Sequence, residues 1–149
     1  MKQEVRLGVI GVGNVGAALI NLVHERAETI TQRTGITLVV SRASVRDLSR
    51  ARGVSLDAKA FTANPLDVVN DSNVDVVVEL MGGIEPARDL ITQALGKGKP
   101  VVTANKALLA EHGAELFAAA DAAGVDLLFE AAVAGGIPFI RPLRESLRG

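Results

Sequence analysis

Three glycines close to the N-terminus have the spacing of a phosphate-binding turn. They follow an apolar run that starts at Val5, and a helical pattern of apolar residues begins directly after them. In such a strand-turn-helix the first glycine permits the tight turn, the second lets the backbone approach a pyrophosphate, and the third lets the helix pack close to the strand. The first N–H groups of the helix would face the phosphates. The turn therefore predicts a dinucleotide site, with a purely structural glycine turn as the alternative. Its residues are Gly11, Val12, Gly13, Asn14, Val15 and Gly16.

Lys106 is the side chain best placed for acid–base chemistry. It comes shortly after the apolar run Pro100–Thr103, which is typical of a strand. A lysine in this place can hydrogen-bond a substrate oxygen or relay a proton. The alternative is an exposed, inert lysine on the first turn of a helix, although a cation is unfavourable at that end of the helix dipole. We therefore predict a catalytic role for Lys106.

Glu130 is a second candidate, because it follows the apolar segment Val125–Phe129, which predicts a buried strand. A buried carboxylate is costly unless backbone donors, a cationic partner or a metal ion stabilise it. The loop after it contains Gly135 and Gly136, and such a loop can turn its carbonyl oxygens toward a hard cation. A bound ion and a hydrogen-bonded structural carboxylate are both open at this point.

A basic cluster follows the second predicted strand, where dinucleotide-binding domains select their cofactor. An acidic residue there binds the ribose hydroxyls of NAD, whereas an arginine can accept the 2′-phosphate of NADP. The tip is predicted at Val45-Arg46-Asp47, and residues 42–59 include five basic side chains against two acidic ones. Guanidinium groups suit a phosphate dianion, so the cluster favours NADP, with NAD and an ordinary charged loop as alternatives. The basic residues are Arg42, Arg46, Arg50, Arg52 and Lys59.

The elements that would position these groups alternate between strand and helix. Apolar runs predict strands at 5–10, 36–45, 74–80, 100–103 and 125–129. Helical patterns are predicted from the glycine turn to about Gln32, then at 66–70, 85–95, from 105, at 114–123 and at 138–147, whereas 52–61 is interpreted as irregular. The alternation predicts an α/β fold of the Rossmann type, a doubly wound and mostly parallel sheet with helices on both faces. The sheet-facing stripe of the first helix is predicted to be Val15, Ala18, Leu19, Leu22 and Val23.

Four loops are expected to meet at one edge of this sheet. Ligands bind such sheets at the carboxyl ends of the strands. Each of the four follows a predicted strand, and most are rich in glycine or carry a polar side chain. This convergence is the main reason, within the sequence itself, to expect a binding site. The loops are 11–16, 81–83, 103–106 and 130–138.

The composition narrows the class of protein. The chain has 149 residues, enough for one domain with its own core, and its formal net charge of −1 gives no reason to expect a nucleic-acid partner. It has no cysteine, so disulfides and thiolate metal sites are excluded. His24 and His112 lack a metal-ligand spacing, and no apolar segment reaches the roughly 18 residues of a membrane span. We therefore expect a soluble, cytoplasmic domain whose partner is a small molecule.

Four segments together resemble the N-terminal half of homoserine dehydrogenase, in order and spacing, from about Val5 to Leu147. Besides the glycine turn they are Glu79-Leu-Met-Gly-Gly83, Gly98-Lys-Pro-Val-Val-Thr-Ala-Asn-Lys106 and Glu130-Ala-Ala-Val-Ala-Gly-Gly-Ile-Pro138. The resemblance implies an enzyme that interconverts L-homoserine and L-aspartate 4-semialdehyde with NAD(P), on the route to threonine, methionine and isoleucine. Aspartate dehydrogenase and dihydrodipicolinate reductase fit the last segment less well. A non-catalytic module that senses NAD(H) is the alternative from another class.

The resemblance also implies roles for single residues. It puts the cofactor diphosphate at Val12 to Val15, and it puts Lys106 near the reacting oxygen. The cluster around Arg46 corresponds to the family's region of cofactor discrimination. Residues implied on the nicotinamide side are Met81, Gly82 and Thr103. The family's monovalent-cation site, usually sodium, would be formed by Glu130 and the backbone of Val133, Gly135 and Ile137.

The family has a second domain, and the resemblance implies one for the complete protein. That domain carries the acidic substrate-binding residues, a further catalytic lysine and an Asn-Gly-Thr-x-Asn-Tyr segment, which does not occur in this chain. We therefore predict that residues 1–149 form an NAD(P)-binding domain with little or no turnover on its own. Because the family pairs chiefly through the second domain, we expect a homo-oligomer for the complete protein and a monomer for this portion.

Overall fold

The apolar runs of the sequence form one parallel sheet. The computed structural model describes residues 3–50, 52–134, 137 and 140–146, and within these ranges six strands pair in the order β3-β2-β1-β4-β5-β6. All neighbouring strands run parallel. This order is that of the doubly wound dinucleotide-binding fold. The strands are β1 (Gln3–Ile10), β2 (Ile36–Ser44), β3 (Phe61–Thr62), β4 (Val76–Glu79), β5 (Val101–Thr103) and β6 (Leu127–Leu128).

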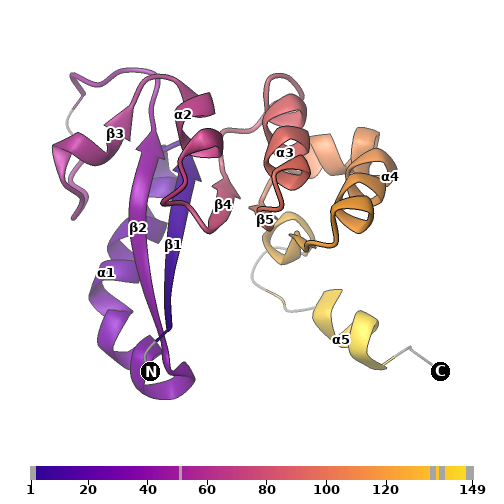
Figure 1. Ribbon diagram of the computed structural model, residues 1–149, viewed down its shortest axis with the longest axis horizontal. Coiled ribbons are helices and arrows are strands. Elements are labelled where there is room, and N and C mark those ends of the chain that lie inside the picture. The colour runs from indigo at the N-terminus through magenta and orange to yellow at the C-terminus, as the bar shows by residue number, and fades with distance from the viewer. Residues whose placement is uncertain (1–2, 51, 135–136, 138–139, 147–149) are drawn as a thin grey trace.

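Helices cover both faces of this sheet (Figure 1). One core lies between the sheet and α1, and includes Val9, Ile20 and Val23. The other lies beneath α2, α3 and α4, and includes Val77 and Leu90. The Rossmann-type fold predicted from the alternation of strands and helices is therefore confirmed. The helices are α1 (Asn14–Thr34), α2 (Pro65–Asn70), α3 (Ala87–Gly96), α4 (Lys106–Ala123) and α5 (Ile140–Ser146), with short 3₁₀ turns at Ala58–Ala60 and Glu130–Ala132.

The predicted sheet-facing stripe of α1 is mostly wrong. Val15 and Leu22 are 63% and 51% exposed, and Ala18 is exposed as well. The buried residues are Gly16, Ile20 and Val23. The physical reason lies at the start of the helix, where Gly16 packs against the carbonyl group of Gly11. This contact turns the side of the helix that carries Gly16 toward the sheet, so that Ile20 and Val23, one and two turns later, become the buried positions.

Residues Lys106–Ala123 form one helix where the sequence predicted two. Gly113 is buried inside it, and only the ring of Phe117 approaches within 4 Å of the position that a Cβ would take. A single glycine weakens a helix by about 1 kcal/mol relative to alanine. The burial of Leu108 and Leu116 on the same helix outweighs that cost, so the chain continues through the glycine.

Smaller differences concern the edges of the sheet. Residues 52–61 are not wholly irregular, because they contain a 3₁₀ turn and lead into the edge strand β3, which pairs with Ala43 and Ser44. The strand predicted at 125–129 is only two residues long, and Leu128 in it is exposed. In the helix predicted at 138–147, Ile140 is half-buried and Leu143 is 38% exposed. Pro138 and Leu147 lie outside the described residues.

An ion pair joins the two central strands at the end away from the predicted ligand loops. The Arg6 guanidinium donates from Nε to Asp75 Oδ2 and from Nη2 to Oδ1, both at 3.0 Å, and the Arg6 backbone N–H donates to Oδ2 at 2.8 Å. The side-chain hydrogen bonds from Arg6 are the main cause that holds the pKa of the Asp75 carboxyl below its ordinary value.

Asp75→Asn is expected to destabilise the domain at pH 7 by about 1 kcal/mol, a modest figure because both side chains are about one-third exposed. A lowered folded-state pKa means that the contribution is complete above the unfolded value of about 4 and is lost as the pH falls through the folded value. Urea unfolding of both proteins at pH 7 and pH 3 measures this. The stability gap should narrow at pH 3, and an unchanged gap would contradict the assignment.

Candidate functional site

A cavity of about 410 Å³ opens at the carboxyl ends of β1, β2 and β4. Its walls come from residues 10–13 of the glycine turn, residues 44–47 and two further arginines of the loop after β2, Ala63 and Pro65, and residues 80–81 after β4. Two of the four loops predicted to converge therefore meet in this cavity. Of the predicted cofactor-binding residues, it brings together Gly11, Val12, Gly13, Arg46 and Met81. Asn14, Val15, Gly16, Gly82, Thr103 and Lys106 are not among its lining residues.

The glycine turn presents free backbone donors to this cavity. Gly11 has a left-handed backbone with φ of 96°, and its N–H donates to the Ser44 carbonyl at 3.1 Å, which fixes the turn against β2. Gly13 is the N-cap of α1, and no side chain caps this helix. The first N–H groups of α1 are consequently available to an anion, and the helix dipole favours negative charge there.

The three glycines differ in what surrounds them. A Cβ on Gly16 would lie 2.2 Å from the Gly11 carbonyl oxygen, and one on Gly11 would lie 2.8 Å from the backbone of Met81. No atom lies within 4 Å of a Cβ position on Gly13. The turn role of Gly11 and the close-packing role of Gly16 are confirmed by these contacts. The approach of Gly13 to a pyrophosphate stays a prediction, and the space that it needs is open.

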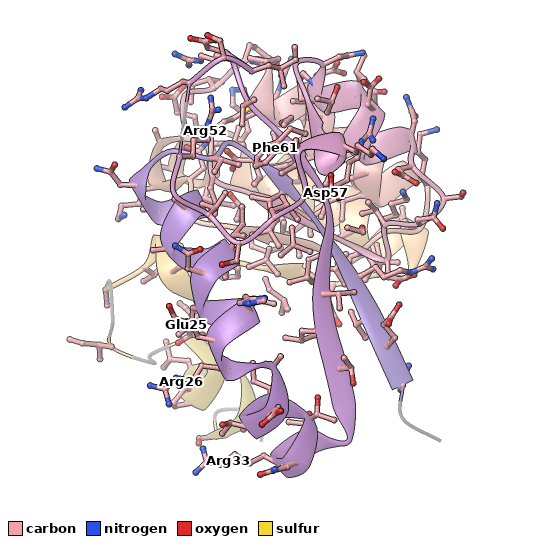
Figure 2. All side chains as sticks on the ribbon, turned by 90° about the vertical axis from the view of Figure 1, so that its left-hand side faces the viewer. Glu25, Arg26, Arg33, Arg52, Asp57 and Phe61 are labelled. Carbon is pink, nitrogen blue, oxygen red and sulfur yellow. The ribbon has the colours of Figure 1, made fainter. Side chains whose placement is uncertain are left out.

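Three members of the basic cluster line the cavity, and two do not. Arg46, Arg50 and Arg52 contribute to its wall. Arg42 instead directs Nη1 to the Lys59 carbonyl at 3.4 Å, on the strand itself. Arg52 lies at the same end of the molecule as Phe61, which pairs beside the carboxyl end of β2, whereas Arg26 and Arg33 lie farther along α1 (Figure 2). The positive charge available to a ligand is thus concentrated in residues 46–52.

Within the cavity wall, Arg46 and Arg50 differ from Arg52. Arg52 donates to the backbone carbonyls of Arg50 and Asp47 and so braces its own loop. Among the residues that the structure describes, no hydrogen bond or ion pair engages the Arg46 side chain. Asp47 accepts from the hydroxyl and the backbone N–H of Ser49, at 2.6 and 2.9 Å, and these bonds lower the pKa of its carboxyl. The Arg50 side chain likewise has no described hydrogen bond or ion pair. Arg46 and Arg50 are therefore the cations of this wall that remain available to a ligand.

Beyond the cavity, a buried network joins the ends of β4 and β5. Glu79 is fully buried, and its Oε1 accepts from the backbone N–H groups of Met81 and Gly82 at 2.9 and 3.0 Å. Its Oε2 accepts from the Thr103 hydroxyl at 2.6 Å. Asn105 extends the network, because its Nδ2 donates to the Gly83 carbonyl at 2.6 Å and its backbone N–H donates to Thr103 Oγ1 at 3.1 Å. The third predicted loop, 103–106, is thereby tied to 81–83.

Lys106 is the first residue of α4 and is exposed. Asn105 caps the helix by accepting the Leu108 N–H at 3.2 Å. The lysine therefore stands beside the network that ends at Asn105, and its side chain is open to a partner from solvent. Its predicted catalytic role stays a prediction.

The residues predicted to hold a cation lie after β6. Glu130 is half-buried rather than enclosed, because β6 is short, and its Oε1 accepts the Ile140 N–H at 3.0 Å at the start of α5. Val133 is half-buried, Ile137 is 65% exposed, and Gly135 lies outside the described residues. The described ranges contain no group of three His, Cys, Asp or Glu side chains that could hold a metal ion. A site of one carboxylate and backbone carbonyls has the oxygen donors that a hard cation prefers, so the chemistry of this set fits the implied ion.

Comparison with known proteins identifies the family. The model of the homoserine dehydrogenase NAD-binding domain matches residues 11–130, which include the glycine turn, the cavity wall except Ile10, and the Glu79 network. The chain belongs to this family. The resemblance inferred from the sequence motifs is thus confirmed, and so is the assignment as the NAD-binding domain of a homoserine dehydrogenase.

Similar proteins from several organisms carry the name homoserine dehydrogenase. The chain is 47% identical over 148 residues to the protein of Mycobacterium tuberculosis, covering 99% of this chain and 33% of the relative. It is 39% identical to that of Bacillus subtilis, covering 97% of this chain and 34% of the relative. The chain therefore spans about a third of the length of the curated homoserine dehydrogenases that it matches.

Solved homoserine dehydrogenases share the fold. The crystal structure from Thiobacillus denitrificans has a TM-score of 0.87 and 50% identity, covering 97% of this chain and 33% of that one. A hyperthermophilic archaeal homoserine dehydrogenase, solved in complex with NADPH, has a TM-score of 0.78 and 25% identity, covering 97% of this chain and 49% of that one. Within the described part of this family member, none of the helices has the length and apolar character that a bilayer span needs.

Sequence reasoning missed Glu79 as a functional candidate. The residue belongs to one of the motifs that resemble homoserine dehydrogenase, but no role was predicted for it. A signal was present, because Glu79 is a carboxylate in the apolar run 74–80. Glu130 has the same kind of apolar context and was expected to need a specific partner, yet Glu79 is the carboxylate that the fold encloses completely.

Proposed function

We propose that the cavity holds NADP or NAD, with a preference for NADP. One observation carries this proposal: a single cavity joins the glycine turn, beside the uncapped start of α1, to the unpaired cation Arg46. The diphosphate would accept from the N–H groups of residues 12–15, and the 2′-phosphate of NADP would pair with Arg46. The complex of the archaeal homoserine dehydrogenase with NADPH supports this choice of ligand.

The nicotinamide end would lie toward Met81, Gly82 and Thr103. Met81 lines the cavity, and the Glu79 network ties the other two residues to it. When bound, the nicotinamide supplies the chemistry of hydride transfer. The chain's own part is to hold the ring against a rigid backbone and to keep the start of α4 close to it.

In the complete protein, we propose the interconversion of L-homoserine and L-aspartate 4-semialdehyde, in the cytoplasmic synthesis of threonine, methionine and isoleucine. Lys106 would hydrogen-bond the oxygen that gains or loses a proton during this reaction. Glu130 and the carbonyls of Val133, Gly135 and Ile137 would bind a sodium ion that orders the loop after β6. The remaining domain would supply most of the homoserine pocket and the contacts of a homo-oligomer.

Arg46→Ala is expected to weaken NADPH binding by about tenfold or more, because a charge-assisted bond to phosphate is lost, and to change NADH binding by less than about twofold. Isothermal titration calorimetry of both cofactors on both proteins measures this. Arg26→Ala is the matched control, since it removes the same charge from the exposed middle of α1, away from the cavity. If Arg46→Ala leaves both affinities unchanged, the proposed phosphate site is wrong.

A further inference from the structure

Glu79 combines complete burial with three hydrogen bonds to functional loops. Its relative exposure is 0%, and all the contacts of its two oxygens recorded above are with donors: two loop N–H groups and one hydroxyl. The other three residues of β4 are valines, and no described ion pair reaches this carboxylate. Burying a carboxylate in such a strand costs free energy that burying an apolar residue would not cost. The hydrogen bonds that Glu79 makes offset that cost.

Apart from the packing of Met81 against the glycine turn and the core, the loop that Glu79 holds has little else to fix its position. Gly82 and Gly83 are consecutive, exposed, and both left-handed, with φ of 72° and 78°. Glycines add no side-chain packing and lose much conformational freedom on ordering. The carboxylate of Glu79 accepts from the first N–H group of this loop, at Met81. Asn105, just after β5, donates to the Gly83 carbonyl. The loop is therefore ordered mainly through these two polar side chains.

The same carboxylate also fixes the neighbouring strand end. Thr103 donates to Glu79 and accepts from the Asn105 N–H, so its hydroxyl proton is committed and its rotamer is set. The chain from Thr103 leads directly into α4, whose first residue is Lys106. One buried side chain thus sets the relative position of the loop 81–83, Thr103 and the start of α4.

We propose that Glu79 is a positioning residue for the nicotinamide half of the cofactor. This inference rests on the proposed function, because the ligand in question is the dinucleotide assigned to the cavity. Glu79 does not touch the cofactor. It holds the backbone of Met81 and Gly82 and the side chain of Thr103 in the arrangement that receives the ring. None of its hydrogen bonds reaches the glycine turn or Arg46, where the phosphates and adenosine would bind.

The test separates the two halves of the ligand. Calorimetry compares NADPH with 2′-phospho-ADP-ribose, which has the same adenosine and phosphates but no nicotinamide, on the wild type and on Glu79→Gln. Glutamine still accepts from the loop N–H groups, but its amide NH₂ would reverse the bond to Thr103, whose hydroxyl proton then loses its carboxylate acceptor. We expect about a tenfold loss for NADPH and less than about a twofold loss for 2′-phospho-ADP-ribose. The fluorescence of bound NADPH should also shift toward that of the free cofactor.

A control variant and a second substitution of Glu79 make the outcome clear. Asp75→Asn is the matched control, because it neutralises a carboxylate at the other end of β4 and should leave both affinities unchanged. If Glu79→Gln does not fold, Glu79→Met removes the buried charge at similar volume, and the exposed loop can turn its N–H groups to water. Equal weakening of both ligands, or no change in either, overturns the positioning role. Failure of the wild type to bind both 2′-phospho-ADP-ribose and ADP-ribose refutes the proposed function instead.

Discussion

Gly13→Ala is expected to leave the domain folded and to weaken binding of NADPH and NADH alike, by about tenfold or more. Gly13 has φ of −85° and ψ of −156°, a backbone that alanine adopts freely. No protein atom lies within 4 Å of the added methyl group, so the fold itself does not oppose it. The methyl group would instead occupy the space above the start of α1, where the diphosphate has to approach the backbone.

The stability of Gly13→Ala should stay within about 1 kcal/mol of the wild type. Alanine is a poorer N-cap than glycine, but it also restricts the unfolded chain, and the two effects oppose each other. Thermal unfolding without ligand checks this, and calorimetry with each cofactor checks the affinity. An unchanged affinity in a well-folded variant would mean that no ligand approaches Gly13, and the dinucleotide would have to bind elsewhere.

Gly16→Ala is expected to destabilise the domain by about 3 kcal/mol or more. The added Cβ would lie 2.2 Å from the Gly11 carbonyl oxygen and 3.2 Å from its carbonyl carbon. Both atoms are backbone in a turn that is itself bonded to Ser44, so neither can move without shifting β1 or α1. Urea or thermal unfolding in the absence of ligand measures the loss.

Gly113→Ala is the matched control for Gly16→Ala, since it makes the same change inside another helix. There the nearest atom is Phe117 Cε2 at 3.8 Å, an ordinary van der Waals distance. Alanine should therefore stabilise α4 by up to about 1 kcal/mol through helix propensity. If the two variants lose stability equally, the cost at Gly16 does not come from its contact with Gly11.

Local patterns allowed much of the fold to be predicted. The turn at Gly11 and the close packing of Gly16 against it depend on residues a few positions apart, and both are confirmed. The rotation of α1 could not be read in this way, because Val15 and Leu22 fit a helical stripe equally well and only the contact of Gly16 with Gly11 selects the other face. The edge strand β3 is two residues long and is defined by its pairing with β2, which leaves no periodicity to detect.

The site shows the same division. The residues that line the cavity around the glycine turn and Arg46 follow from strand ends and charge. The role of Glu79 depends on the distance between its oxygens and Thr103, which lies on another strand, so no spacing along the chain reveals it. The convergence of loops predicted that these strand ends would be neighbours, but not which side chain would join them.

The central position of β1 has a consequence for the order in which the chain can fold. Leu7 pairs on one side with Val40 of β2 and on the other with Val76 of β4. Arg6 and Asp75, which join β1 to the start of β4, are separated by 69 residues. The entropy of closing such a long loop is lost before the contacts between β1 and β4 can form, and this loss slows folding. During synthesis, the segment up to β3 emerges first, with one side of β1 still unpaired. The cavity wall reaches residue 81, so nucleotide can stabilise this domain only after β4 has docked, and a ligand present during refolding should act on that late step.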